Sequence, residues 1–296
     1  MISGEDLWRW QEQAKQAAIA KAIPPMEVDW LLQEKLGLDR LSLRLGTYRG
    51  EIYPQWDWLT LQQLWQRRLQ ERVPVQYLAE QTPWRHLRLR VGPGVLIPRP
   101  ETEQIIDIAL AQVAVDPTLG QGRWVDLGTG SGAIALGLAQ ALPHGRIEAV
   151  DCSAIALEIA RHNATLNHCA QRVTFHQGQW WEPFAGQSEK FAAMVSNPPY
   201  IPSSMVDHLE PEVRDHEPRL ALDGGEDGLA ALRQLVTTAP DYLQPGGLWL
   251  VELMAGQAPT VAAMLAAEGN YTRIAIYPDL AGIERFVLAY TKSGQD

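Results

Sequence analysis

The residues best suited to chemistry form the short stretch Asn197-Pro198-Pro199-Tyr200. An apolar run at 191–195 precedes it and predicts a buried strand, which must end at Pro198 because proline lacks the N–H that a sheet requires. Ligands of α/β sheets bind just beyond the carboxyl ends of the strands. An asparagine held there by two rigid prolines could position a planar amino group. Asn-Pro turns without such a role are also common, and this stretch alone leaves both interpretations open.

A second group of residues could bind a nucleoside. The segment 126–132, Asp-Leu-Gly-Thr-Gly-Ser-Gly, lies between a predicted strand at 123–125 and a predicted helix at 133–142. Glycines at such a junction allow a tight turn and let backbone N–H groups approach a ligand closely. Asp151 ends the next predicted strand, and a carboxylate at that place can accept both ribose hydroxyls. The candidate cofactor-binding residues are therefore Gly128, Thr129, Gly130, Ser131, Gly132 and Asp151, to which we add Trp180 and Asn197.

The glycines alone do not identify the nucleoside. They also satisfy the relaxed dinucleotide pattern, whereas a P-loop is excluded because no Gly-Lys-Ser/Thr follows. Asp126 would put a carboxylate where a pyrophosphate sits, which disfavours a dinucleotide and favours a cofactor that carries an ammonium and a sulfonium. Trp180 and Trp181 follow the third predicted strand. Either ring could stack on an adenine, and either could equally belong to the core.

Strands alternate with helices from residue 123 onward, which predicts an α/β fold with a mostly parallel, Rossmann-like sheet covered on both faces. A further helix is expected from about residue 105, with Glu101 or Thr102 as its N-cap. The predicted strands are 123–125, 147–150, 173–176, 191–195, 248–252, 273–277 and 285–290, and the predicted helices are 133–142, 154–167, 229–243 and 261–268.

Residues 1–75 have helical periodicity and predict a small helical bundle. Ser3 with Asp6 three residues later predicts the start of the first helix, and Gly37 predicts the end of the second. A loop rich in Gly, Tyr and Pro follows at 46–56. Seven of the eleven tryptophans precede residue 96, so this domain has a core of its own or presents an aromatic surface to a partner.

Residues 76–97 predict a β-hairpin that connects two domains. Apolar residues alternate with arginines from 87 to 91, residues 92–94 (Gly-Pro-Gly) form the turn, and 95–97 return as the second arm. Residues 98–296 then form the catalytic domain.

Composition excludes several classes of protein. Among 296 residues, 46% are hydrophobic, yet no apolar run is long enough to span a membrane, and the first 20 residues do not resemble a signal peptide. Cys152 and Cys169 provide neither a disulfide framework nor metal-ligand spacing, so we expect no metal and a cytoplasmic location. The net charge is −10, and residues 96–296 carry 24 acidic against 12 basic residues. Such a domain is a poor direct partner for nucleic acid.

The glycine loop, Asp151 and 197–200 in this order resemble the class I S-adenosylmethionine-dependent methyltransferases that methylate planar amino groups. Further stretches are similar to the HemK-type release factor glutamine N5-methyltransferases. One departure is Glu252-Leu-Met-Ala-Gly-Gln257, where the family pattern has a glycine sooner after the glutamate. The stretches are Val95-Leu-Ile-Pro-Arg-Pro-Glu-Thr-Glu103, Asp126-Leu-Gly-Thr-Gly-Ser-Gly-Ala133, Glu217-Pro-Arg-Leu-Ala-Leu222, Gly224-Gly-Glu-Asp-Gly-Leu229 and Asp279-Leu-Ala-Gly-Ile-Glu-Arg285.

This resemblance implies an antiparallel last strand, S-adenosyl-L-methionine as methyl donor and the glutamine of the Gly-Gly-Gln loop of class-1 peptide chain release factors as acceptor. It implies Asn197 and Pro198 as catalytic residues and Asn197, Pro198, Pro199 and Tyr200 as the substrate clamp. The rival is an adenine-N6 nucleic-acid methyltransferase, which shares the Asn-Pro-Pro-Tyr motif.

We expect a monomer whose helical domain docks the protein substrate. An arginine-rich joint is expected to help: Arg67, Arg68, Arg72, Arg85, Arg88 and Arg90.

Overall fold

The computed structural model describes residues 2–53 and 57–293, so parts of the predicted 46–56 loop and both ends of the chain lie outside the described residues. The chain forms two compact units. The helical unit contains the described residues up to Thr82 together with Glu210–His216, and the catalytic unit contains Pro83–Leu209 and the described residues from Glu217 onward. A short segment of the second half of the chain therefore belongs to the helical unit.

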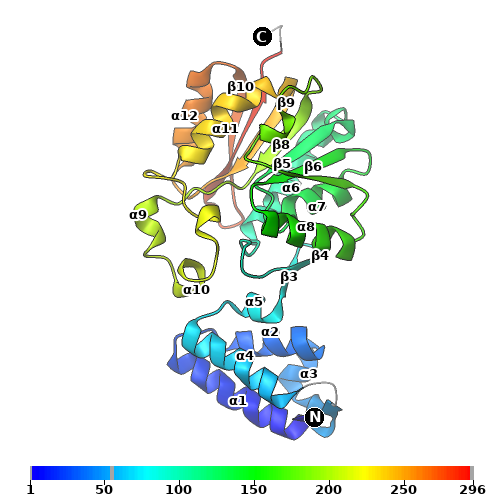
Figure 1. Cartoon of the computed structure of the whole chain (residues 1–296), viewed down its shortest axis with the longest axis vertical. Helices are drawn as coiled ribbons and strands as arrows, with labels where there is room; N and C mark the ends of the chain where they lie inside the picture. The colour runs from blue at the N-terminus through cyan, green and yellow to red at the C-terminus, as the bar shows by residue number, and fades with distance from the viewer. Residues whose placement is uncertain (1, 54–56, 294–296) are drawn as a thin grey trace. The chain divides into compact units, whose positions relative to one another are not determined.

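The helical unit is built as its periodicity predicts (Figure 1). Ser3 is the N-cap of α1, and its hydroxyl accepts a hydrogen bond from Asp6 N at 3.1 Å, which confirms the predicted start. Gly37 ends α2 in the left-handed conformation, also as predicted. The elements are β1 (Ile2–Ser3), α1 (Gly4–Ala20), α2 (Met26–Leu36), α3 (Arg40–Leu45), β2 (Ile52–Tyr53), α4 (Trp58–Glu71), α5 (Val75–Ala79) and α10 (Pro211–Arg214).

The core of the helical unit is aliphatic and aromatic. Leu7, Leu31 and Leu61 are fully buried. The Trp10 ring meets Trp65 edge to face, with ring centroids 6.4 Å apart. For these two tryptophans the structure favours the core interpretation.

Arg68 of α4 is the centre of a buried ion-pair cluster in the helical unit. Its Nη2 donates to Glu27 Oε1 of α2 at 3.0 Å, and its Nη1 donates to Glu212 Oε1 of α10 at 2.7 Å. Arg72 also pairs with Glu212. Arg68 is 2% exposed, so its assignment to a docking surface is wrong: its charge is used inside the unit, where it joins α2, α4 and α10.

The catalytic unit contains a seven-stranded sheet in the order β10-β11-β9-β8-β5-β6-β7. Five neighbouring strands are parallel, and β11 is antiparallel to both β9 and β10, which confirms the expected fold class. The strands are β5 (Arg123–Leu127), β6 (Arg146–Asp151), β7 (Val173–Gln177), β8 (Phe191–Ser196), β9 (Leu243–Glu252), β10 (Tyr271–Pro278) and β11 (Glu284–Thr291).

Helices cover both faces of this sheet, as Figure 1 shows. Side chains of α6 (Gln104–Val115), α7 (Ala133–Ala141) and α8 (Ala154–Leu166) form one buried cluster with the sheet. Side chains of α11 (Ala230–Thr238) and α12 (Ala258–Glu268) form a second cluster on the opposite face. Strands buried on both faces explain the uninterrupted apolar runs in the sequence.

The β-hairpin differs from the prediction. Its arms are β3 (Gln81–Trp84) and β4 (Leu87–Arg90), whereas 95–97 form no strand. The predicted turn at Gly92 exists, because Val95 N donates to Gly92 O at 3.3 Å. The returning segment does not pair with β4, since helix α8 occupies that edge: Asn163 and Asn167 each accept from and donate to the β4 backbone through their side-chain amides.

We expect Arg68→Ala to lower the free energy of unfolding of the helical unit by about 3 kcal/mol, because Glu27 would lose its buried guanidinium partner. Urea titration followed by far-ultraviolet circular dichroism measures the loss. The neighbouring Arg67→Ala is the matched control, because Arg67 is exposed and pairs with Glu71 across one helical turn, an interaction worth about 0.5 kcal/mol or less. Equal losses in the two variants would contradict a structural role for the cluster.

Candidate active site

Three strand ends converge at one edge of the sheet. Strand β5 pairs in parallel with β6 on one side and β8 on the other, and Leu127 lies opposite both Val150 and Ser196. The next residues along the three strands are Gly128, Asp151 and Asn197. Strand order reverses here, because β6 lies on one side of β5 and β8 on the other, which is where open α/β sheets bind their ligands.

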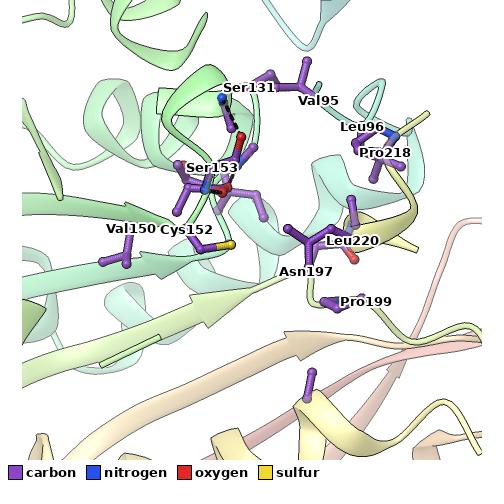
Figure 2. A pocket seen from close by; sticks show the side chains of 18 of the residues that line it. Val95, Leu96, Ser131, Val150, Cys152, Ser153, Asn197, Pro199, Pro218 and Leu220 are labelled. Atoms are coloured by element: carbon purple, nitrogen blue, oxygen red, sulfur yellow. Dashed lines mark hydrogen bonds between the residues drawn. The ribbon is translucent and has the colours of Figure 1, made fainter. Parts of the chain in front are cut away.

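A cavity of about 440 Å³ opens at this edge. In Figure 2, Ser131, Cys152 and Ser153 line one side, Leu96, Pro218 and Leu220 lie across from them, and Asn197 and Pro199 complete the wall. Of the candidate residues, Gly128, Thr129, Gly130, Ser131, Asp151, Trp180, Asn197 and Pro199 line the cavity. The other three candidate residues, Gly132, Pro198 and Tyr200, do not line the cavity.

The glycine loop is held by the neighbouring strand. Gly128 N and Thr129 N both donate to Val150 O at 2.9 Å, which bends the chain back over the end of β6. Gly132 is the N-cap of α7 with φ 86°, and a Cβ atom there would approach Ala160 Cβ to 3.2 Å. Gly132 therefore serves the turn and the approach of α7 to α8, while the preceding residues of the loop face the cavity.

Asp151 connects the glycine loop to the next helix. Its Oδ2 accepts from Gly130 N at 2.8 Å and its Oδ1 accepts from Ser153 N at 2.9 Å. Burial raises the pKa of this carboxyl, while these backbone donors oppose the rise. Each carboxylate oxygen has two lone pairs, so Asp151 can still accept hydrogen bonds from a ligand in the cavity.

Asp126 is placed differently from what the sequence suggested. It is fully buried and does not belong to the cavity wall. Its Oδ2 accepts from Thr129 Oγ1 at 2.6 Å and from Ala135 N at 3.1 Å, and burial raises its pKa to about 7. The prediction that Asp126 contacts a cationic cofactor is therefore wrong. The carboxyl instead fastens the glycine loop to the first turn of α7.

The structure distinguishes the two adjacent tryptophans. Trp180 lines the cavity beside Gly128 and has a left-handed backbone, with φ 50°. Trp181 is 4% exposed and stacks on Tyr242, with ring centroids 4.6 Å apart. Trp180 is therefore the tryptophan that can contact a ligand, and Trp181 belongs to the core.

Asn197 is held by a residue from another loop. Its Nδ2 donates to Thr102 Oγ1 at 3.1 Å, across 95 positions of the sequence. Thr102 was predicted as a helix cap together with Glu101, but neither side chain caps α6, which follows a short 3₁₀ turn at Glu101–Glu103. The threonine hydroxyl is buried and serves the asparagine instead. With Nδ2 engaged, Asn197 Oδ1 remains as an acceptor for a ligand.

The rest of the motif is anchored from β9 and the turn that follows it. Tyr200 Oη donates to Glu252 Oε1 at 3.3 Å, and the Tyr200 carbonyl accepts from Gln257 Nε2 at 3.0 Å. The glycine of this turn is Gly256, with φ 89°, and it comes later after Glu252 than the family pattern has it. In the sequence, Glu252 and Gln257 were named only as the ends of a stretch that departs from the family pattern and neither was given a role, although a glutamate at the end of an apolar strand was a usable signal.

Two other groups were missed in the same way. Glu217, whose side chain is almost fully buried, accepts from Arg99 Nη2 at 2.7 Å and from Ile97 N at 3.3 Å, and so holds the loop that brings Arg99 to the cavity. Asn163 Nδ2 donates to Ser131 O at 2.9 Å, which supports the glycine loop from below. Their partners are far apart in sequence, so no local pattern reveals them.

We expect Trp180→Ala to weaken ligand binding in the cavity while leaving thermal stability almost unchanged. The matched variant Trp181→Ala removes a buried ring and is expected to cost about 3–5 kcal/mol of stability. Calorimetry with S-adenosylhomocysteine and thermal unfolding of both variants separate the two effects. If Trp181→Ala weakened binding in a still stable protein, the assignment of the two rings would be wrong.

Comparison with known proteins identifies the family of this chain. A family model described as the methyltransferase small domain matches residues 107–209. A relative from Synechocystis sp., named release factor glutamine methyltransferase, is 54% identical over 99% of this chain and 98% of its own length. A relative of the same name from Thermosynechococcus vestitus is 47% identical over 98% of this chain and 100% of its own length.

A solved methyltransferase from Pyrococcus furiosus matches 70% of this chain and 90% of its own with a TM-score of 0.51. At 17% identity this likeness concerns the fold. The family follows from the two relatives that match along the whole chain: the protein belongs to the release factor glutamine methyltransferases.

Proposed function

We propose that this protein transfers a methyl group from S-adenosyl-L-methionine to the side-chain amide nitrogen (N5) of the Gly-Gly-Gln glutamine in class-1 peptide chain release factors. The observation that carries the proposal is the position of Asn197. Its amide is fixed by Thr102 on the wall of the same cavity that Asp151 and the glycine loop line. Asn197, proposed to hold the substrate amide, and the residues proposed to bind the nucleoside therefore line one cavity.

The cavity fits S-adenosyl-L-methionine, which when bound supplies an electrophilic methyl group on a cationic sulfur. Asp151 has free lone pairs for the ribose hydroxyls, and Gly128 and Gly130 leave room for the close approach of a ligand. Trp180 offers a ring face for the adenine. Asp151 and Asp223, the acidic side chains of the cavity wall, also suit a cofactor that carries a cationic sulfur.

The proposed clamp would compensate for the low nucleophilicity of the substrate amide nitrogen. An amide nitrogen is a poor nucleophile because its lone pair is delocalised into the carbonyl. Asn197 Oδ1 would accept one N–H group of the glutamine and orient the nitrogen toward the methyl donor. The family resemblance assigns the second N–H group to the carbonyl of Pro198, a residue that lies outside the cavity wall. Pro198 and Pro199 restrict the backbone, so this arrangement costs little conformational entropy. Tyr200, held by Glu252 and Gln257, would support the loop behind the substrate.

The protein substrate is inferred from the relatives and from charge. Both relatives carry release factor glutamine methyltransferase as their name. Adenine-N6 methylation of nucleic acid is disfavoured because the catalytic half is acidic, with 24 acidic against 12 basic residues from 96 to 296. Release factors act in translation, so the cytoplasm is the proposed place of action. No described helix is long and apolar enough to cross a membrane.

Docking of the release factor is assigned to the helical unit. This unit exposes several large apolar side chains, and two of them, Leu41 and Leu45, lie one turn apart on α3 with 64% and 62% exposed. Exposed apolar side chains on one helical face are typical of a surface that binds another protein.

Incubation with the methyl donor and a purified release factor is expected to add the mass of one methyl group to the Gly-Gly-Gln glutamine, as tandem mass spectrometry would locate. Asn197→Ala should abolish turnover and keep cofactor binding, whereas Asp151→Ala should lose cofactor binding. A release factor with that glutamine replaced by alanine and a duplex DNA are the substrate controls. Methylation of the DNA in place of the release factor would refute the proposal.

The double variant Leu41→Asp, Leu45→Asp is expected to raise KM for the whole release factor by about tenfold, the effect of losing a central apolar contact. A short peptide that contains Gly-Gly-Gln should react as with the unaltered enzyme, because it lacks the rest of the release factor that the docking surface would bind. Leu280→Asp alters a 96% exposed leucine of the catalytic unit and is the control. If KM for the whole release factor stayed unchanged, docking would use another surface.

A further inference from the structure

Glu252 is a buried carboxyl group that the proposed chemistry does not use. It ends β9, is 1% exposed and does not line the cavity. Tyr200 Oη donates to its Oε1 at 3.3 Å, while its Oε2 is buried and has no hydrogen-bond partner in the described part of the chain. A buried carboxyl oxygen without a donor is costly, so its retention here requires an explanation.

The Thr102 hydroxyl is the candidate donor for this oxygen. Its hydroxyl accepts from Asn197 Nδ2 at 3.1 Å, so its own proton must point to a different acceptor. Thr102 is also one of the groups that stabilise the ionised form of the Glu252 carboxyl. A Thr102 proton directed at the partnerless Oε2 of Glu252 would extend the Asn197–Thr102 hydrogen bond into a relay of three side chains.

The direction of this relay decides which end of the Asn197 amide faces the cavity. If Thr102 donated to Asn197 instead, the amide would turn over and present Nδ2 to the substrate. Two N–H donors would then meet the N–H groups of the glutamine amide and repel them. A carboxylate can only accept, so ionised Glu252 draws the Thr102 proton away from Asn197 and excludes the reversed arrangement.

We propose that Glu252 is a positioning residue that acts through Thr102 to keep Asn197 Oδ1, and not Nδ2, directed at the substrate amide. This inference rests on the proposed function, because it concerns the orientation of the same clamp. Glu252 does not line the cavity, so it would act on the substrate only through Thr102.

The charges around Glu252 are consistent with a group that titrates near neutrality. Burial raises its pKa to about 7, opposed by the Thr102 and Tyr200 hydroxyls and by Arg285 of β11, while Glu101 adds to the rise. Arg285 is itself paired with Asp279 at 2.7 Å, so it compensates Glu252 only in part. Protonated Glu252 could donate to Thr102 and reverse the relay. The rate at saturating substrates should therefore fall as the pH drops through about 7.

The test uses the full chain and a whole release factor. Glu252→Gln can donate to Thr102 through its amide, so it permits the reversed relay, and we expect kcat to fall about 10- to 100-fold, as for other small misplacements of reacting groups. Thr102→Val breaks the relay and should give a similar loss, whereas Thr102→Ser keeps the hydroxyl and should retain activity. The dissociation constant of S-adenosylhomocysteine should stay the same in all three variants.

Two readouts exclude a merely structural role. The double variant Thr102→Val, Glu252→Gln should be no slower than the slower single variant, because both act through one relay. The fall of kcat below about pH 7 should be absent from Glu252→Gln. Multiplied losses in the double variant, an unchanged pH profile, or wild-type kcat in Glu252→Gln would each overturn the inference. If Glu252→Gln fails to fold, the comparison of Thr102→Val with Thr102→Ser decides: equal rates refute the relay.

If the proposed methylation of release factors is itself wrong, the experiment gives a different result. In that case the unaltered enzyme leaves the release factor unmethylated, and no variant is informative about orientation. Methylation by the unaltered enzyme with full activity in Glu252→Gln and Thr102→Val would refute the positioning role alone.

Discussion

The parallel pairing of β5 with both β6 and β8 is the constraint on which the site depends. Parallel strands end at the same edge, so the register that sets Leu127 opposite Val150 and Ser196 also sets the starting points of three loops. The glycine loop then bends back because two of its N–H groups donate to the Val150 carbonyl. The glycine loop, Asp151 and Asn197 thus become neighbours at one edge of the sheet.

Three buried carboxyl groups behind the cavity convert this framework into a rigid site. Asp126 ties the glycine loop to α7, Glu217 ties the Arg99 loop, and Glu252 holds Tyr200. Apolar residues of the same size would be easier to bury. Each carboxyl instead accepts a hydrogen bond that fixes the geometry of a loop, although its burial is less favourable than that of an apolar side chain. Burial raises the pKa of Asp126, Glu217 and Glu252, because it disfavours their charged form.

Much of this site follows from local sequence patterns. Asn197, Asp151 and the glycine loop could be recognised because each directly follows a short apolar strand, and strand ends are where such a sheet binds ligands. The alternation of strands and helices likewise predicts the mostly parallel sheet, whereas the antiparallel β11 was implied by the family resemblance. The features recognised from the residues themselves depend on positions that are close together in the sequence, where periodicity and turn chemistry determine the outcome.

The errors concern partners that are distant in the sequence. Residues 95–97 look like a hairpin arm, but the edge of β4 is taken by asparagines more than 70 positions away. Thr102 looks like a helix cap, yet its hydroxyl is used by Asn197. Arg68 looks like a surface arginine in the sequence, but in the folded chain it pairs with Glu212, 144 positions away. A hydrogen-bonding side chain can satisfy a local or a distant partner equally well, and only the folded chain decides between them.

The chemistry proposed for the cavity depends on the orientation of the substrate amide and not on a base that removes its proton. Removal of an amide proton before methyl transfer would need a strong base, but burial raises the pKa of the Tyr200 hydroxyl beyond its ordinary value, and Glu252 lies outside the cavity wall. Once the new N–C bond forms, the nitrogen carries a positive charge and loses a proton readily to water. The difficult requirement is therefore to hold a delocalised lone pair in line with the methyl donor. A fixed acceptor on rigid prolines, with its own orientation set from behind, meets that requirement without a titrating group in contact with the substrate.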